Sequence, residues 1–244
     1  MVTVKRHYDA FLAGVFSWII GDFDNAYRKN KAFFDALGLS GRPDSIAVDL
    51  GSGPGCQSIP LAEAGFEVLA IDFCQELLDE LAGHAGSLAI RTVCADILDF
   101  RQHLAGQADL IVCMGDTLVH LPDRQSVDTL LIDVAGALNP GGTFIYAIRD
   151  YVEYVPQGSE RFVPIRATDE QIFTCFLDYR DDVVHVHDVL HRKIDGEWTF
   201  NVSDYQKLRV DSRAVDEVLV RNGLVIAERR IENGLITVVA RRPE

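Results

Sequence analysis

Apolar runs alternate with helical patterns along residues 45–149 of the chain. The strand-like apolar runs lie at residues 45–50, 67–72, 87–94, 109–114 and 143–148. Helical patterns fill the gaps between them, notably at residues 76–81 and 124–138. Continuous apolar runs are typical of strands covered on both faces, and parallel strands need long connections that are usually helices. The alternation therefore predicts an α/β fold with a parallel sheet between two layers of helices.

Beyond residue 165 the pattern becomes mainly β. Three β-rich runs follow one another without helices, at residues 171–179, 183–192 and 198–210. The turns "RDD" and "DGE" between them suit antiparallel hairpins. A helix that ends at Gly223 and two strands joined through "ENG" complete the chain. We expect one domain over residues 1–244, in which residues 165–210 form an antiparallel layer inserted after the fifth strand.

The N-terminal region contains the apolar run "AFLAGVFSWII", residues 10–20, which follows Lys5 and Arg6. This run is too short to span a bilayer, and "GDFDNAYRKN" follows it where a signal peptide would have a small-residue cleavage site. We therefore expect a helix that packs on the domain, and no membrane segment.

Composition narrows the classes of partner and the compartment. The 244 residues are 48% hydrophobic, enough for a full core, and carry a formal net charge of -14. A negative field repels phosphate backbones, so we expect no nucleic-acid partner. The chain has five cysteines and no CxxC motif, which favours a reducing, cytoplasmic location.

A glycine-rich stretch, "VDLGSGPGCQ", follows the first predicted strand. Gly51, Gly53 and Gly55 permit a tight turn and a close ligand approach beyond the carboxyl end of that strand. The dinucleotide fingerprint would require glycine or alanine at Cys56, and it does not call for an acid at Asp49. The pattern present is D-x-G-x-G-x-G.

This pattern resembles motif I of the class I S-adenosylmethionine-dependent methyltransferases. The resemblance runs from about residue 27 to the C-terminal hairpin and implies a Rossmann-like seven-stranded sheet with S-adenosylmethionine as cofactor. It further implies cofactor contacts from several motif positions. These are Asp49, Gly51, Ser52, Gly53 and Gly55 in the first motif, Asp72 on the ribose hydroxyls, Phe73 beside the adenine, Asp96 and Ile97 at the adenine edge, and Met114 near the methyl group.

The segments "VCMGDTLVHLPD" and "FIYAIRDYVEY" resemble the glycine N-methyltransferase-type branch of that family. There an amide residue and an arginine orient an amino-acid substrate, and Asp116 and Arg149 stand at their positions. Asp116 or His120 is the candidate base, and Arg149 is the candidate for a substrate carboxylate. The alternatives are an N-cap role for Asp116 or Thr117, a helix-surface position for His120, and a surface ion pair of Arg149 with Asp150 or Glu153.

The upstream stretch "YRKNKAFFDALGL" resembles the family helix in which an arginine reaches the methionine carboxylate, which implies that role for Arg28. Tyr8, Trp18 and Tyr27 are candidates to close over the cofactor, so residues 1–40 are treated as a helical lid region. For Trp18, simple core packing is the alternative.

The sequence thus predicts methyl transfer by in-line displacement to an amine or hydroxyl of a small molecule. An NAD(P)-dependent oxidoreductase and a non-catalytic S-adenosylmethionine-binding protein are the alternative functions. His185, His187 and His191 alternate in "HVHDVLH", but no fourth ligand is evident and we expect no metal. The inserted layer is expected either to cap the acceptor pocket or to join two subunits of a homo-oligomer.

Overall fold

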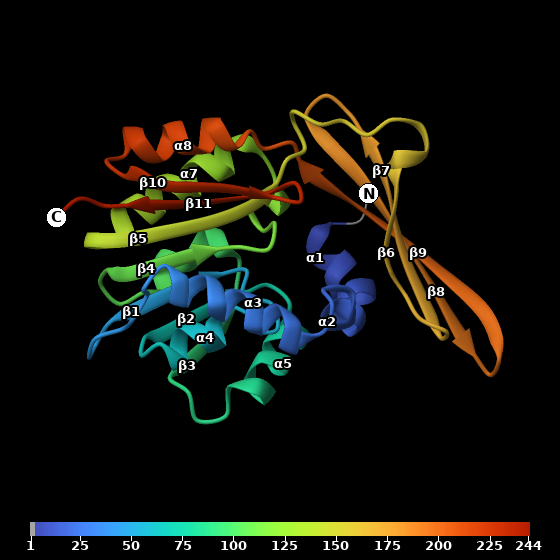
Figure 1. Ribbon diagram of the computed structural model, residues 1–244, viewed down its shortest axis with the longest axis horizontal. Coiled ribbons are helices and arrows are strands. Elements are labelled where there is room, and N and C mark those ends of the chain that lie inside the picture. The colour runs from blue at the N-terminus through green and yellow to red at the C-terminus, as the bar shows by residue number, and fades with distance from the viewer. Residues whose placement is uncertain (1–2) are drawn as a thin grey trace.

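The computed structural model describes residues 3–244 and contains a seven-stranded and a four-stranded sheet (Figure 1). The larger sheet has the order β10-β11-β5-β4-β1-β2-β3. Its strands are β1 (Ile46–Leu50), β2 (Glu67–Asp72), β3 (Ile90–Cys94), β4 (Ala108–Cys113), β5 (Leu138–Arg149), β10 (Val225–Glu232) and β11 (Leu235–Arg241). Strands β1 to β5 are parallel, whereas β11 runs antiparallel to β5 and β10 antiparallel to β11. The predicted α/β fold with a C-terminal antiparallel hairpin is confirmed.

Helices cover both faces of this sheet. On one face lie α3 (Phe23–Ala36), α4 (Ser58–Glu63) and α5 (Gln75–Ala85), which pack through Phe34, Leu61 and Leu81. On the other face lie α7 (Arg124–Ala137) and α8 (Ser212–Arg221), and the short α6 (Phe100–His103) follows β3. The predicted helix at 124–138 is confirmed. It ends at Ala137, and β5 begins directly after it at Leu138, before the start of the strand predicted at residues 143–148.

The inserted layer is a four-stranded antiparallel sheet, β6-β7-β8-β9, beside the larger sheet (Figure 1). Its strands are β6 (Phe162–Ala167), β7 (Gln171–Tyr179), β8 (Val183–Ile194) and β9 (Glu197–Leu208). The sequence predicted β7, β8 and β9, but no strand at β6, which contains Pro164. Pro164 is tolerated because β6 is an edge strand and its pairing with β7 is irregular between Pro164 and Arg166.

The two sheets share one hydrophobic core. Val184, Val186 and Tyr205 of the four-stranded sheet belong to the same buried cluster as the strands and helices of the larger sheet. One face of the smaller sheet, called here its inner face, therefore packs against the larger sheet and its helices. No helix in residues 3–244 is long and apolar enough to cross a membrane.

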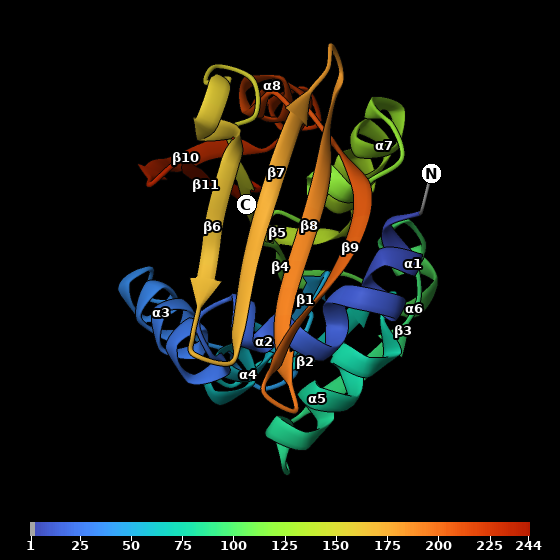
Figure 2. The same ribbon diagram turned by 90° about the vertical axis from the view of Figure 1, so that its right-hand side faces the viewer.

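Residues 4–19, called here the roof segment, lie between the two sheets (Figures 1 and 2). The expected single helix is instead four short pieces: α1 (Val4–His7), a π-helical turn at Tyr8–Leu12, a 3-10 turn at Ala13–Val15, and α2 (Phe16–Ile19). Gly14 and the β-branched Val15, both poor helix formers, lie at the break.

The roof segment is anchored mainly to the inner face of the four-stranded sheet. Its Leu12 and Val15 pack with Phe173 and Leu190. His7 is fully buried, and its Nε2 lies 3.0 Å from Oδ2 of Asp188, while its Nδ1 lies 2.8 Å from Oγ of Ser203. Arg166 forms a second anchor, since its guanidinium donates to both carboxylate oxygens of Asp22 and to the carbonyl of Trp18. Trp18 therefore has the packing role that was its alternative.

We predict that Asp188→Ala lowers the free energy of unfolding by about 1–3 kcal/mol, because the buried His7 ring loses one of its two partners and the Cys175 thiol loses its acceptor. Urea denaturation measures the effect. Asp204→Ala, a half-buried aspartate of the same sheet without hydrogen-bond partners in the described structure, is the matched control and should change stability by less than about 0.5 kcal/mol. Equal losses in both variants would show that the anchor contributes nothing.

Candidate functional site

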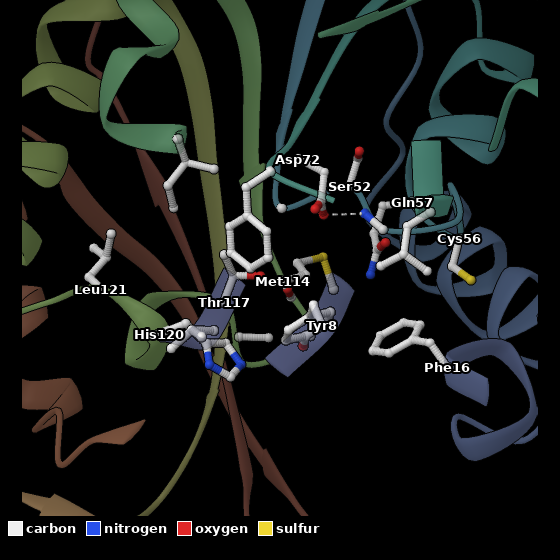
Figure 3. A pocket seen from close by; sticks show the side chains of 18 of the residues that line it. Tyr8, Phe16, Ser52, Cys56, Gln57, Asp72, Met114, Thr117, His120 and Leu121 are labelled. Atoms are coloured by element: carbon white, nitrogen blue, oxygen red, sulfur yellow. Dashed lines mark hydrogen bonds between the residues drawn. The ribbon is translucent and has the colours of Figure 1, made fainter. Parts of the chain in front are cut away.

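A cavity of about 710 Å³ lies at the carboxyl ends of β1, β2 and β4, between those ends, the roof segment and the end of β9 (Figure 3). Of the residues predicted for the site, those lining it are Gly51, Ser52, Gly53, Asp72, Phe73, Asp96, Ile97, Met114 and His120. The others, Arg28, Asp49, Gly55, Asp116 and Arg149, do not line it. Most residues predicted to contact the cofactor therefore lie together at the cavity. Of the residues predicted to contact the acceptor, Asp116 and Arg149 lie outside it.

The glycine loop approaches other segments so closely that side chains would not fit. Gly51 has φ +78°, and a Cβ there would lie 2.5 Å from Cγ2 of Thr117 in the loop after β4. At Gly55, with φ +95°, a Cβ would meet Cγ of Leu81 at 2.7 Å. Gly55 thus serves the packing of α5 behind the loop, whereas Gly51 keeps the two loops that border the cavity in contact.

Asp72 joins the glycine loop to the end of β2. Its Oδ2 accepts from the backbone N–H of Gly53 and its Oδ1 from that of Cys74, each at 2.9 Å. Burial raises the pKa of this carboxyl, and the two backbone donors oppose that rise. A carboxylate has about four lone-pair sites. Asp72 can therefore accept further hydrogen bonds from a ligand in the cavity.

Asp49 lies in β1, directly before the glycine loop, and does not line the cavity. It is buried, its Oδ2 accepts from Oγ of Ser58 at 2.6 Å, and burial raises its pKa to about 7. The first motif therefore contacts the cavity through Gly51, Ser52 and Gly53, and the buried Oγ of Ser52 has no hydrogen-bond partner in residues 3–244. An orphaned hydroxyl beside the cavity is a group that a polar ligand would satisfy.

Part of the cavity wall beyond the glycine loop is apolar. Phe73, Ile97 and Met114 line the cavity, and the Phe73 ring meets Tyr8 edge to face at 5.4 Å between centroids. Asp96 lines the cavity as well, and its Oδ1 caps the following 3-10 turn by accepting from the N–H of Leu98 at 3.0 Å. Flat apolar walls with a carboxylate at the edge are suited to a heteroaromatic ring.

Asp116 is a structural carboxylate in this structure. It has φ +75° and is 6% exposed. Its Oδ1 accepts from the N–H of Arg149 at 2.8 Å, and its Oδ2 from the Tyr151 hydroxyl at 2.8 Å and from Nζ of Lys207 at 2.6 Å. Burial acts to raise its pKa, but Lys207 and the Arg149 N–H outweigh burial and lower it. Because Asp116 is ionised, paired and outside the cavity lining, the structure gives it no contact with an acceptor.

The two arginines predicted for carboxylate binding also lie elsewhere. Arg149 is exposed at the end of β5, and its side chain neither lines the cavity nor forms an ion pair with any acid in residues 3–244, so neither of its expected roles is seen. Arg28 is exposed on α3, and the neighbouring Lys29 and Asn30 line the cavity in its place. Tyr27 donates to Glu63 at 2.6 Å and does not line the cavity.

His120 lines the cavity beside two aromatic rings. Its ring meets Tyr8 edge to face at 5.9 Å and stacks on Tyr205 at 5.6 Å. Burial lowers its pKa to about 3, and the positive charge of Lys207 acts in the same direction. Its Nδ1 is buried and has no hydrogen-bond partner within the described chain. Figure 3 shows His120, Tyr8 and Phe16 across the cavity from Asp72 and Ser52.

Several residues of the site come from segments for which sequence reasoning gave no signal. Gln206 and Leu208 of β9 line the cavity, and Lys207 between them points to Asp116. The alternation of β9 separates these side chains into two sets, but the sequence does not show which set faces the domain. Among residues 3–244, no group of three metal-ligating side chains lies together, and the three histidines of β8 share its outer face.

Comparisons with known proteins agree with this geometry. Residues 47–142 match the family described as "Methyltransferase domain". The chain is 30% identical over 132 residues to a glycine/sarcosine N-methyltransferase of Halorhodospira halochloris, covering 53% of this chain and 49% of that protein. It is 34% identical over 113 residues to a ubiquinone biosynthesis O-methyltransferase of Methylococcus capsulatus, covering 45% and 44%. The chain spans about half the length of the curated relatives it matches.

The fold extends the similarity over nearly the whole chain. The CcbJ methyltransferase of Streptomyces caelestis superposes with a TM-score of 0.78 at 16% identity, covering 98% of this chain and 99% of that one. The seven-stranded fold implied by the resemblance to the class I S-adenosylmethionine-dependent methyltransferases is thereby confirmed, and residues 47–142 are similar to methyltransferase domains. These matches give no support to the nicotinamide-dependent or non-catalytic alternatives.

Proposed function

Since residues 47–142 match a methyltransferase domain and the described chain has the class I fold, we propose that the protein is an S-adenosylmethionine-dependent methyltransferase. It moves a methyl group by in-line displacement to an uncharged amine or hydroxyl of a small molecule. The observation that carries the proposal is the cavity wall made by the glycine loop, Asp72 and the orphaned Ser52 hydroxyl. A reducing, cytoplasmic location suits the five cysteines, all of them free.

The residues present fit the cofactor. Asp72 has lone pairs left for the two ribose hydroxyls, and the Ser52 hydroxyl lacks a partner. Phe73, Ile97 and Met114 provide the apolar surface that an adenine ring would bury. Lys29 and Asn30 are the polar residues at the α3 side of the cavity and would receive the amino-acid end. When bound, S-adenosylmethionine supplies a methyl group already activated by the positive sulfur.

The charges around the remaining space determine which acceptor fits. The acids that line the cavity are Asp72 and Asp96, both beside the cofactor residues, because Lys207 holds Asp116 outside it. No carboxylate lining the described cavity is therefore left to stabilise an ammonium ion, and Arg149 is not placed to hold a carboxylate. Leu121, Pro122 and Leu208 give that part of the wall an apolar surface. A neutral acceptor avoids the desolvation of an unpaired charge.

His120 and Tyr8 are the polar groups that would orient the nucleophile. A neutral imidazole can accept a hydrogen bond from an O–H or N–H group, and burial keeps His120 neutral at physiological pH. The Tyr8 hydroxyl has no hydrogen-bond partner in the described residues and can donate, because burial raises its pKa. The roof segment and His120 thereby exclude water and align the acceptor, which is the main contribution the protein has to make.

Calorimetric titration tests the cofactor assignment. We expect S-adenosylmethionine and S-adenosylhomocysteine to bind, and NADH and NADPH not to bind. Asp72→Ala should weaken S-adenosylhomocysteine binding at least 100-fold, because the ribose hydroxyls and the glycine loop lose their common acceptor. Asp79→Ala, an exposed aspartate on α5, is the control and should bind normally. Unchanged affinity in Asp72→Ala would refute the site.

The acceptor assignment predicts that glycine and sarcosine are not substrates, although relatives act on them. With 1 mM of either, S-adenosylhomocysteine should form no faster than without an acceptor, because Arg149 does not reach the cavity. Analogues without a carboxylate such as glycinamide, whose amine loses its proton more readily, are the matched comparison. Efficient methylation of glycine but not of glycinamide would contradict a site built for neutral acceptors.

For an acceptor found by such a screen, the pH profile of kcat/KM should show no inflection from His120 near pH 6.5. The pKa of about 3 keeps the ring neutral over the working range, and activity lost on acidification should instead follow the acceptor's own amine. His120→Leu should lower kcat about 100-fold while the affinity for S-adenosylhomocysteine stays within twofold. An inflection near 6.5 that disappears in His120→Leu would show that the ring titrates in the ordinary range.

A further inference from the structure

The outer face of the four-stranded sheet carries large apolar side chains where a solvated sheet would carry polar ones. This face points away from the domain, toward the viewer in Figure 2. Four of its side chains are strongly exposed: Phe200 at 67%, Phe162 at 58%, Val202 at 54% and Trp198 at 50%. Antiparallel sheets that cover a domain on one face usually alternate apolar-in and polar-out. The exposed apolar surface is therefore a departure that requires a partner.

The strand register shows that these side chains form one continuous surface. Phe162, Phe176 and His187 are neighbours across β6, β7 and β8. The next row contains Pro164, Thr174, Val189 and Val202, and the row after it Ile172, His191 and Phe200. Rings within the rows are in contact, with Phe162 and Phe176 at 4.6 Å and His191 and Phe200 at 5.9 Å. These rows and Trp198 are called here the outer apolar face.

The charges of this face nearly cancel, unlike those of the whole chain. Lys193 lies at one end, and Asp178 and Asp204 lie at the other. Arg161 covers the Phe176 ring at 4.6 Å and pairs with Asp178 at 2.6 Å. Arg180 also pairs with Asp178 at 2.6 Å, so three cations and two anions give this face a charge of +1, whereas the chain carries -14. Two copies of the chain therefore avoid at this face the repulsion between their negative charges. A strongly charged partner would gain no electrostatic attraction from this surface.

The shape of the face suits another sheet of the same kind. Strands about 4.8 Å apart, with nine residues at about 3.4 Å each, give four strands a planar face of about 600 Å². Projecting side chains make the accessible area larger than the planar one, which brings it close to the roughly 800 Å² per partner of a standard interface. Two such faces pack at about 10 Å with their strands nearly aligned.

We propose that the outer apolar face joins two copies of this chain into a two-fold dimer, sheet against sheet. Val189 and Val202 lie side by side in the central row, near the two-fold axis. If the two-fold axis lies between the two faces and perpendicular to the strands, each end of one face lies over the opposite end of the other. Lys193 then approaches the end of the partner's face that carries the two aspartates. Because β9 also supplies Gln206 and Leu208 to the cavity, the dimer would hold one wall of each active site.

Sedimentation equilibrium of the full chain between 1 and 100 μM tests the proposal. The expected result is a dimer whose mass falls to that of a monomer in Val202→Glu. Ile132→Glu, which changes a 50% exposed residue on α7, is the matched control and should remain dimeric. Val202→Thr preserves strand propensity and shape while adding a hydroxyl. It should raise the dimer dissociation constant at least tenfold, so the result does not depend on the glutamate variant folding.

A wild-type monomer at 100 μM would overturn the proposal. So would a dimer of undiminished affinity in both Val202 variants, which would indicate pairing through an edge strand or another surface. Binding of S-adenosylhomocysteine by each variant confirms that the fold is intact.

Discussion

A buried carboxylate in the loop after β4 requires a cation, and that cation comes from the other sheet. Asp116 and Lys207 are 2.6 Å apart, with side chains 9% and 13% exposed, and Tyr151 donates to the same oxygen. Removing one partner of such a pair costs about 3–5 kcal/mol, because the other charge is left without compensation. The pair therefore holds the four-stranded sheet against the carboxyl ends of the parallel strands. The position of β9 and the absence of a free acid beside the acceptor follow from it, whereas the neutrality of His120 is due mainly to burial.

The part of the site that comes from neighbouring segments of the chain could be predicted from sequence. The part that comes from the four-stranded sheet could not. Gly51, Gly53 and Asp72 act within one strand-loop-strand unit, whose geometry follows from the order of parallel strands, and the structure places them together at the cavity. Lys207 gave no signal, because a lysine in an amphipathic strand is ordinarily solvated and its register against another sheet is a tertiary property. Without Lys207, Asp116 looked like a free carboxylate. The same limit applies to the fold, in which the edge strand with Pro164 and the division of residues 4–19 into four short helical pieces were missed.

The roof segment connects the two sheets in the same way as the Asp116 pair, but through weaker and more local contacts. Tyr8 and Phe16 face the cavity, while His7 and Trp18 bind the inner face of the four-stranded sheet. A ligand enclosed beneath it therefore contacts residues that depend on both sheets. In this arrangement the cofactor wall belongs to the α/β core and the roof to the inserted sheet, so selectivity for the acceptor can change without altering the cofactor site.

The central claim is that the cavity beneath the roof segment binds S-adenosylmethionine through Asp72, while Asp116 stays paired with Lys207. A crystal structure of the protein with S-adenosylhomocysteine tests both parts directly. The account predicts both ribose hydroxyls within hydrogen-bond distance of Asp72, the sulfur on the side of Met114 and His120, and an intact Asp116–Lys207 pair. Ligand density outside this cavity, or an Asp116 carboxylate released from Lys207 and turned toward the sulfur, would contradict it.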